Sequence, residues 1–162
     1  SIEGGDRYNA IPREATAVVV VPQAQSAGFE KFVSNYEAIV KSELAATEPR
    51  LSIGLCEAPL PKKVMNQPSQ DAMLNALYGS INGVLRMSDG VPGLVETSSS
   101  MGILRVGNGQ WMAGMLVRSA VDSARDDVAQ KLAAVMQLAG AQTTIKAPTP
   151  AGVPTPTLPC WL

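Results

Sequence analysis

Histidine is absent from this sequence of 162 residues. It is the commonest metal ligand in proteins and the usual general acid or base near neutral pH. A catalytic triad built on histidine is therefore excluded within the chain. A catalytic zinc site made only from these residues would need carboxylates and thiolates alone, which is unusual.

Cysteine is also scarce, with only Cys56 and Cys160 in the chain. They stand far apart and form no CxxC pair, so the sequence predicts no disulfide framework and favours a reducing cytoplasm. The longest apolar run, residues 17–22, is far too short to cross a bilayer, and the first residues lack the pattern of a secretion signal. We therefore expect a cytoplasmic protein without a membrane partner.

Neither sign of charge is in excess, because the chain has 13 basic and 14 acidic residues. No basic surplus is available to neutralise phosphates, which argues against a nucleic-acid partner. Hydrophobic residues make up 46% of the chain and charged residues 17%, a balance typical of a globular domain and not of a disordered chain.

Hydrophobic periodicity predicts three helices. Helices are expected after the caps Ser26 and Ser69, and from about Ser123 to Ala139, where Gly140 supplies a left-handed stop. Strands are expected at residues 14–22, 51–56, 84–87 and 141–146, and a long hairpin at residues 94–106 and 110–119.

The expected strands favour an α+β fold. The valines of residues 14–22 make both faces of that strand apolar, which predicts a central strand covered on both sides. Hairpins dominate the second half of the chain. We therefore expect one domain over residues 1–147, with a mainly antiparallel sheet and helices packed on one face.

Residues 148–162 differ in kind, because prolines recur throughout them. Such a segment is not expected to join a helix or a central strand. The sequence predicts a flexible or disordered tail.

Carboxylates and hydroxyls suggest few reactive sites. Asp122, Asp126 and Asp127 begin the third expected helix, where negative charge suits the positive end of the helix dipole better than it suits a metal. Residues 98–100 are three serines, but no histidine is available to activate one as a nucleophile. Arg118 ends an apolar strand. A guanidinium can hold a carboxylate with two parallel hydrogen bonds, although an exposed charge at a strand end is the simpler interpretation.

Three groups of residues resemble bacterial aminoacyl-histidine dipeptidases. They occur in the family's order and span about residues 1–147. They are Gly4-Gly5 with Asn9-Ala10-Ile11-Pro12-Arg13-Glu14-Ala15; Asn82-Gly83-Val84-Leu85-Arg86 with Ser88-Asp89 and Gly93-Leu94-Val95-Glu96-Thr97-Ser98; and Leu116-Val117-Arg118-Ser119 with Asp122-Ser123 and Leu138-Ala139-Gly140-Ala141.

The resemblance implies a part of a zinc-dependent dipeptidase that cleaves dipeptides ending in histidine, such as β-alanyl-histidine. It corresponds to the lid domain, which closes over the dipeptide and carries homodimer contacts. The zinc ligands and the general base then belong to a separate catalytic domain, so this segment is expected to be non-catalytic. Arg118 matches the arginine expected to bind the carboxylate of the dipeptide, and Asn9 matches an asparagine on the active-site side of the lid.

The chain departs from the family pattern at three places. A strand and a helix of the lid should precede Ser1, so the lid is expected to be incomplete at its N-terminus. Ser100 stands where the family usually has asparagine. The tail lacks a Pro-Gly-Trp motif, yet codons for residues 150–156 read one base earlier can encode Pro-Gly-Trp-Gly-Ala-Asp-Pro. We therefore expect the tail to be a frameshift product, which the nucleotide sequence tests.

A different class of function remains open from the residues alone. A chain of this size can fold by itself, and it can then act as a self-association or small-ligand-binding module. The gene upstream of Ser1 discriminates the two hypotheses, since encoded zinc-ligand motifs there support the dipeptidase.

Overall fold

A computed structural model describes residues 1–146 and 157–161 of the chain. The chain divides into two compact units, which we call the sheet unit and the helical unit. Ser1–Ala17 and Met65–Leu162 make up the sheet unit, and Val18–Val64 make up the helical unit. The predicted boundary between residues 147 and 148 lies outside the described residues.

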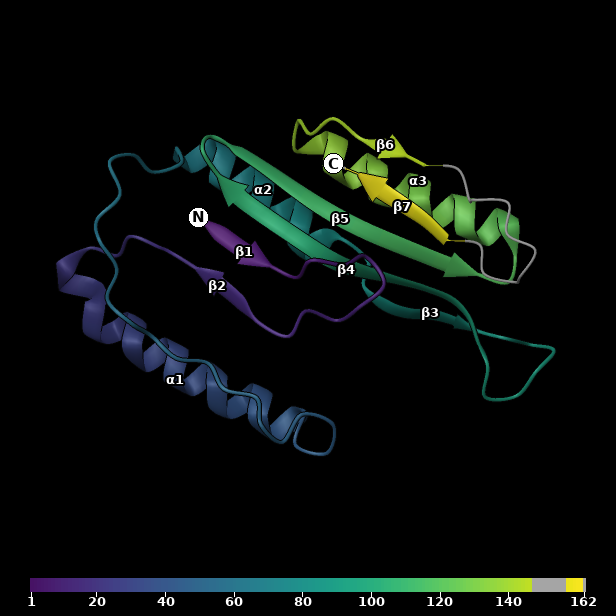
Figure 1. Cartoon of the computed structure of the whole chain (residues 1–162), viewed down its shortest axis with the longest axis horizontal. Helices are drawn as coiled ribbons and strands as arrows, with labels where there is room; N and C mark the ends of the chain where they lie inside the picture. Colours follow the sequence, from purple (N-terminus) through teal and green to yellow (C-terminus); the bar gives the residue numbers. More distant parts are fainter. Residues whose placement is uncertain (147–156, 162) are drawn as a thin grey trace. The chain divides into compact units, whose positions relative to one another are not determined.

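Seven strands of the described residues form one sheet (Figure 1). They are β1 (Ile2–Gly4), β2 (Ala15–Ala17), β3 (Gly83–Met87), β4 (Val95–Gly107), β5 (Gln110–Ser119), β6 (Thr144–Ile145) and β7 (Thr157–Trp161). Their order is β2-β1-β4-β5-β7-β6, and β3 also pairs with β4. All these pairs are antiparallel, so the α+β class and the antiparallel sheet predicted from the sequence are confirmed.

The β4–β5 hairpin is the centre of the sheet unit. Its turn has positive φ at Asn108 (52°) and Gly109 (77°), as the Asn-Gly pair predicts. Both strands are long, and β4 pairs with β1 and β3 along its other side. The hairpin predicted from local residues is therefore the element on which the remaining strands assemble.

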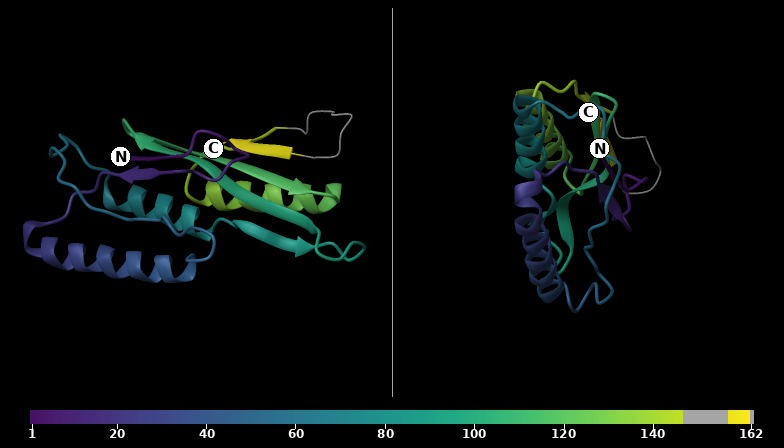
Figure 2. Two further views of the ribbon diagram at one scale, coloured as in Figure 1. Left: turned by 60° about the horizontal axis from the view of Figure 1, so that its bottom comes forward. Right: turned by 90° about the vertical axis from the view of Figure 1, so that its left-hand side faces the viewer.

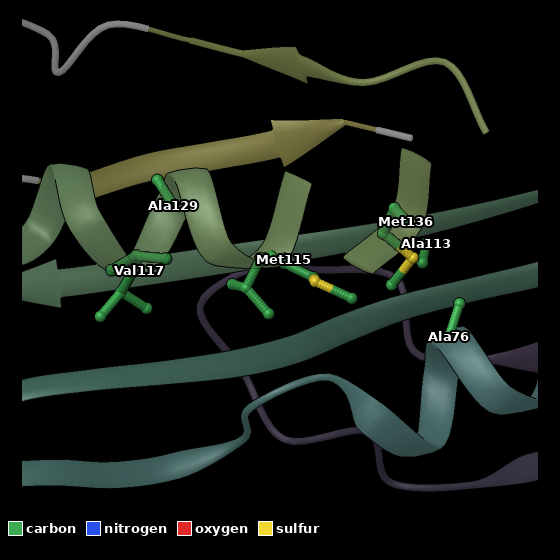
Figure 3. Close-up of a cluster of buried hydrophobic side chains, with 8 residues drawn as sticks. Ala76, Ala113, Met115, Val117, Ala129 and Met136 are labelled. Atoms are coloured by element: carbon green, nitrogen blue, oxygen red, sulfur yellow. The ribbon is translucent and has the colours of Figure 1, made fainter. Parts of the chain in front are cut away.

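Helices α2 (Gln67–Gly79) and α3 (Asp122–Leu138) cover one face of this sheet (Figure 2). The core lies between them and β5, and Figure 3 shows these side chains meeting from the three elements. Its buried members are Ala76, Ala113, Met115, Val117, Val128, Ala129, Leu132 and Met136. Alternate residues of β5 enter the core, so the intervening residues face the other side of the sheet.

Both helices begin and end for local reasons. The side chain of Asn66, and not Ser69, caps α2 by accepting a hydrogen bond of 3.0 Å from the Ser69 amide. The predicted cap was three residues late because Pro68 fits the first helical turn, where no backbone donor is needed. Helix α3 stops before Gly140, whose φ of 77° confirms the predicted left-handed end.

The prediction of a central strand at residues 14–22 is wrong. Only Ala15–Ala17 form a strand, β2, which lies at the end of the sheet and is exposed along its length. A strand needs a neighbour to accept its backbone hydrogen bonds, and β2 has one only in β1. The high strand propensity of the valines does not replace that partner.

The helical unit contains η1 (Gln23–Gln25) and α1 (Ser26–Glu43), and α1 confirms the predicted helix. The strand predicted at residues 51–56 does not form. The amide of Ile53 instead donates a hydrogen bond of 3.1 Å to the carboxylate of Glu37 in α1. A side chain thus satisfies the backbone donor that a neighbouring strand would have taken.

Residues 157–161, within the proline-rich segment, form a strand although proline disfavours one. Strand β7 pairs with β5 on one side and with β6 on the other. β6 reaches only Cys160 and Trp161, so Pro159 has a strand neighbour on the β5 side alone. Proline is tolerated where one side of the strand has no hydrogen-bonding partner.

Candidate functional site

The face of the hairpin opposite α2 and α3 is called the open face here. A bulge in β4 changes which side chains lie on it. The pairing with β5 shifts between Met101 and Ile103, so Gly102 is an extra residue. Met101 and Leu104 both pack against the core although they stand three positions apart. The same shift places Ser100 and Arg105 together on the open face, because side chains alternate on either side of the bulge.

The connection between β1 and β2, residues 5–14, lies against this open face (Figure 1). A β-carbon at Gly102 would overlap the carbonyl of Arg7 and lie 2.9 Å from the Cα of Tyr8. A β-carbon at Gly114 would overlap the ring of Tyr8. The connection can approach so closely because both strands present glycine there.

Hydrogen bonds hold the connection at two points. Arg105 Nη1 donates to the carbonyl oxygens of Gly4, at 2.8 Å, and Leu104, at 2.9 Å, and its Nη2 donates to that of Gly5. The hydroxyl of Ser100 donates to the carbonyl oxygen of Tyr8 at 3.3 Å. Burial of the Tyr8 phenol raises its pKa above the ordinary value of 10.0, so the group is neutral at physiological pH.

Asn9 follows Tyr8 and meets Arg118 in a pocket of about 140 Å³. The pocket is lined by Asn9, Ser98, Ser99, Ser100, Leu116 and Arg118. Ser98 is paired with Arg118, and Ser100 with Leu116, across β4 and β5. The tertiary structure therefore brings both candidate residues, Asn9 and Arg118, into one place.

The chemistry of this pocket suits a small anion. Arg118 is exposed, and among the described residues no carboxylate pairs with it. Its guanidinium presents a planar set of donors that matches a carboxylate, and the Ser98 hydroxyl and the Asn9 amide can donate further hydrogen bonds. Leu116 supplies an apolar surface for the ligand's carbon atoms.

Two other arginines of the sheet unit, Arg86 and Arg125, are paired with carboxylates. Arg86 is paired with Glu96. Arg125 is buried and contacts Asp122 and Asp126 in the first turns of α3. The hydrogen bond from Arg125 to Asp126 is the main cause that raises the pKa of Arg125. Two of the aspartates that were expected to complement only the helix dipole thus pair with a buried cation.

The serines of residues 98–100 have different surroundings. Ser99 is buried and donates a hydrogen bond of 2.6 Å to the carbonyl oxygen of Ile81. The hydroxyl of Ser100 donates to the carbonyl oxygen of Tyr8. Among the described residues, both hydroxyls donate to backbone carbonyl oxygens, so their contacts are structural.

A larger hollow of about 550 Å³ lies within the helical unit. Its lining consists of Val20, Val21, Pro22, Ala24, Gln25, Gly28 and Phe29. It is open and contains no charged side chain. Specific ligand sites combine an apolar surface with converging polar groups, so the smaller pocket at Arg118 is the better candidate.

Within the part of the chain that the structure describes, no three His, Cys, Asp or Glu side chains gather in a way that could hold a metal ion. No helix in that part is long and apolar enough to span a membrane. Sequence reasoning missed Arg105 and Gly102. Their importance depends on the bulge in β4. The only sign of that bulge in the sequence is an isolated glycine within an expected strand.

Comparison with known proteins shows similarity to dipeptidases in both sequence and structure. Over 151 residues the chain is 35% identical to the cytosol non-specific dipeptidase of Escherichia coli (strain K12), covering 93% of this chain and 31% of that protein. The aminoacylhistidine dipeptidase from Vibrio alginolyticus has a matching structure with a TM-score of 0.84 and 35% identity, covering 87% of this chain and 29% of that one. No family model matches the chain.

The chain thus spans about a third of the length of the dipeptidases that it matches. Both sequence and three-dimensional structure agree over most of this chain. The resemblance identified from the sequence motifs is therefore confirmed.

Proposed function

From this relationship to one part of the aminoacyl-histidine dipeptidases, we propose that the chain is the substrate-covering lid of a cytoplasmic dipeptidase. The substrates are dipeptides with C-terminal histidine, of the β-alanyl-histidine type. The lid closes over the dipeptide and holds its carboxylate without cutting the peptide bond. The observation that carries this proposal is the convergence of Asn9 and Arg118 in one pocket.

Arg118 is the residue assigned to the carboxylate. Two parallel hydrogen bonds from its guanidinium fix both the position and the orientation of that group. Asn9 and the Ser98 hydroxyl complete the polar lining without adding a negative charge that would repel the ligand. Holding one end of a dipeptide in this way fixes where its peptide bond lies, which is how a binding group assists a reaction at a distance.

The hydrolytic step belongs to other residues. The family resemblance implies zinc, but the described residues do not provide a suitable donor set, and histidine is absent from the whole chain. Purified chain supplied with zinc is expected not to hydrolyse β-alanyl-histidine. Zinc-dependent turnover by the chain alone would contradict this part of the proposal.

The central test concerns Arg118 in the dipeptidase that contains this segment. Arg118→Ala should raise KM about 10- to 100-fold with a smaller change in kcat, because a hydrogen bond to a charged group contributes roughly 1.5–3 kcal/mol. Arg118→Lys should retain part of the affinity, since a lysine keeps the charge but not the planar fork. Arg50→Ala, an exposed arginine in the helical unit, is the matched control. An unchanged KM for Arg118→Ala would refute the assigned role.

The lid also contributes to a homodimer in this proposal. Helix α1 exposes Phe32, Tyr36 and Ile39, with exposed fractions of 63%, 51% and 62%. Their spacing places them on one side of the helix, and the rings of Phe32 and Tyr36 are stacked with centroids 6.2 Å apart. An apolar stripe of this kind supports helix-to-helix contact with a second copy. Sedimentation analysis should show a dimer, which Tyr36→Glu should dissociate. A monomer without any substitution would contradict the proposed homodimer.

A further inference from the structure

We propose that Arg105 is a positioning residue for the Arg118 pocket. It fixes the start of the connection between β1 and β2, and thereby holds Asn9 beside Arg118. The inference rests on the proposed function only for the identity of the ligand. The positioning itself is a property of the unliganded chain and can be tested without any dipeptide.

Arg105 bonds to the backbone where the connection begins, and we call this set of hydrogen bonds the clamp. Its guanidinium donates to the backbone carbonyl oxygens of Gly4 and Gly5, where β1 ends and the connection begins. Gly5 has a φ of 63°, so the chain turns away from β1 at this residue. A charged donor on two consecutive carbonyl groups fixes the direction in which the connection leaves the sheet.

The clamp lies only a short distance along the chain from the pocket. Only three residues separate Gly5 from Asn9. The last of them, Tyr8, is held by Ser100 and lies against Gly102 and Gly114. The backbone before Asn9 is therefore held at both ends, and little movement remains besides that of the Asn9 side chain.

The bulge at Gly102 determines on which face of the sheet Arg105 lies. If β4 continued without an extra residue, alternation would direct Arg105 to the face covered by α2 and α3. Gly102 reverses that alternation and brings Arg105 to the side where the connection lies. The same residue leaves room for Arg7 and Tyr8. One irregularity thus serves both the clamp and the close approach, which is a common use of bulges beside functional sites.

Lysine cannot reproduce this clamp. An ammonium group is a point charge on a flexible stem, whereas the guanidinium reaches three carbonyl oxygens at once in a fixed plane. Arg105→Lys should therefore keep the charge and lose much of the positioning. Arg105→Gln should lose both.

The experiment measures backbone order and ligand affinity in the same variants of the whole chain. In the unliganded protein, NMR order parameters of the amides at residues 7–9 should fall from about 0.85 to below about 0.6 in Arg105→Gln. They should fall partly in Arg105→Lys and in Ser100→Ala. Arg50→Gln is the control and should leave them unchanged. Unchanged order in Arg105→Gln would overturn the proposal.

The affinity measurement distinguishes positioning from general loss of structure. The Kd for β-alanyl-histidine should rise about tenfold in Arg105→Gln, equivalent to one well-placed hydrogen bond at the pocket. In an Asn9→Ala background, Arg105→Gln should have almost no further effect, because its action passes through Asn9. Additive effects of the two substitutions would overturn the positioning role.

The two proposals can fail separately. If the chain without any substitution does not bind β-alanyl-histidine, the proposed ligand is wrong. The NMR order parameters then still show whether Arg105 holds the connection. If the dipeptide binds and Arg105→Gln changes neither order nor affinity, the clamp is wrong and the proposed function is unaffected.

Discussion

Ser98 and Arg118 stand directly opposite each other in the pairing of β4 with β5, and both line the pocket on the open face. The adjacent pair, Thr97 and Ser119, is buried on the other face, where its hydroxyl oxygens lie 2.8 Å apart. Two neighbouring residue pairs of the same strands therefore differ: the hydroxyls of Thr97 and Ser119 contact each other, whereas Ser98 and Arg118 are available to a ligand. The alternation of side chains in a strand accounts for the difference.

The core between the sheet and α3 can be tested with two leucines of the same helix. Leu132 is 1% exposed and Leu138 is 89% exposed. Leu132→Ala should lower the free energy of unfolding by about 2–5 kcal/mol, because it leaves a cavity that the core cannot fill. Leu138→Ala should change it by less than about 0.5 kcal/mol. Urea denaturation followed by circular dichroism measures both, and equal effects would contradict the described packing.

The close approach at the bulge can be tested with two glycines of β4. Gly102→Ala should destabilise the fold by about 1–3 kcal/mol and displace residues 7–8, because its methyl group would overlap their backbone. A β-carbon at Gly107 would meet no atom within 4 Å, so Gly107→Ala is the matched control. The comparison uses urea unfolding together with the amide shifts of Arg7 and Tyr8. A neutral Gly102→Ala with unchanged shifts would show that the connection does not lie there.

The helical unit should respond to acid through Glu37. The hydrogen bond from Lys41 is the main cause that lowers the pKa of Glu37 below its ordinary value of 4.5, and the Ile53 amide contributes next. A carboxyl group with a lowered pKa in the folded state stabilises that state above its unfolded pKa. The contribution is lost as the pH falls through the folded pKa.

The amide resonance of Ile53 reports this titration directly. It should shift as the pH is lowered below 4.5, with a midpoint below that value, because protonation removes the acceptor of its hydrogen bond. Glu37→Gln keeps a similar shape and cannot titrate, so the shift should disappear in that variant. A midpoint at or above 4.5 would mean that the contacts of Glu37 do not favour its charged form.

Several elements were predictable because neighbouring residues decide them. The apolar spacing of α1, the Asn108-Gly109 turn and the stop at Gly140 each depend on interactions within a few positions. The family resemblance was likewise carried by short motifs. From the residues alone, however, an exposed charge at a strand end was the simpler interpretation of Arg118. Only the resemblance singled out Asn9.

The sequence by itself determined the helices and the central hairpin. Its lack of histidine also excludes a histidine-based reaction centre within the chain. The tertiary structure decided that β2 has one neighbour, that β7 joins the sheet and that Gly102 is a bulge. It also decided that Asn9 and Arg118 line one pocket. The physical reason is that strand pairing, register shifts and the passage of a connection over a sheet depend on hydrogen-bonding partners and free space supplied by residues distant in the chain.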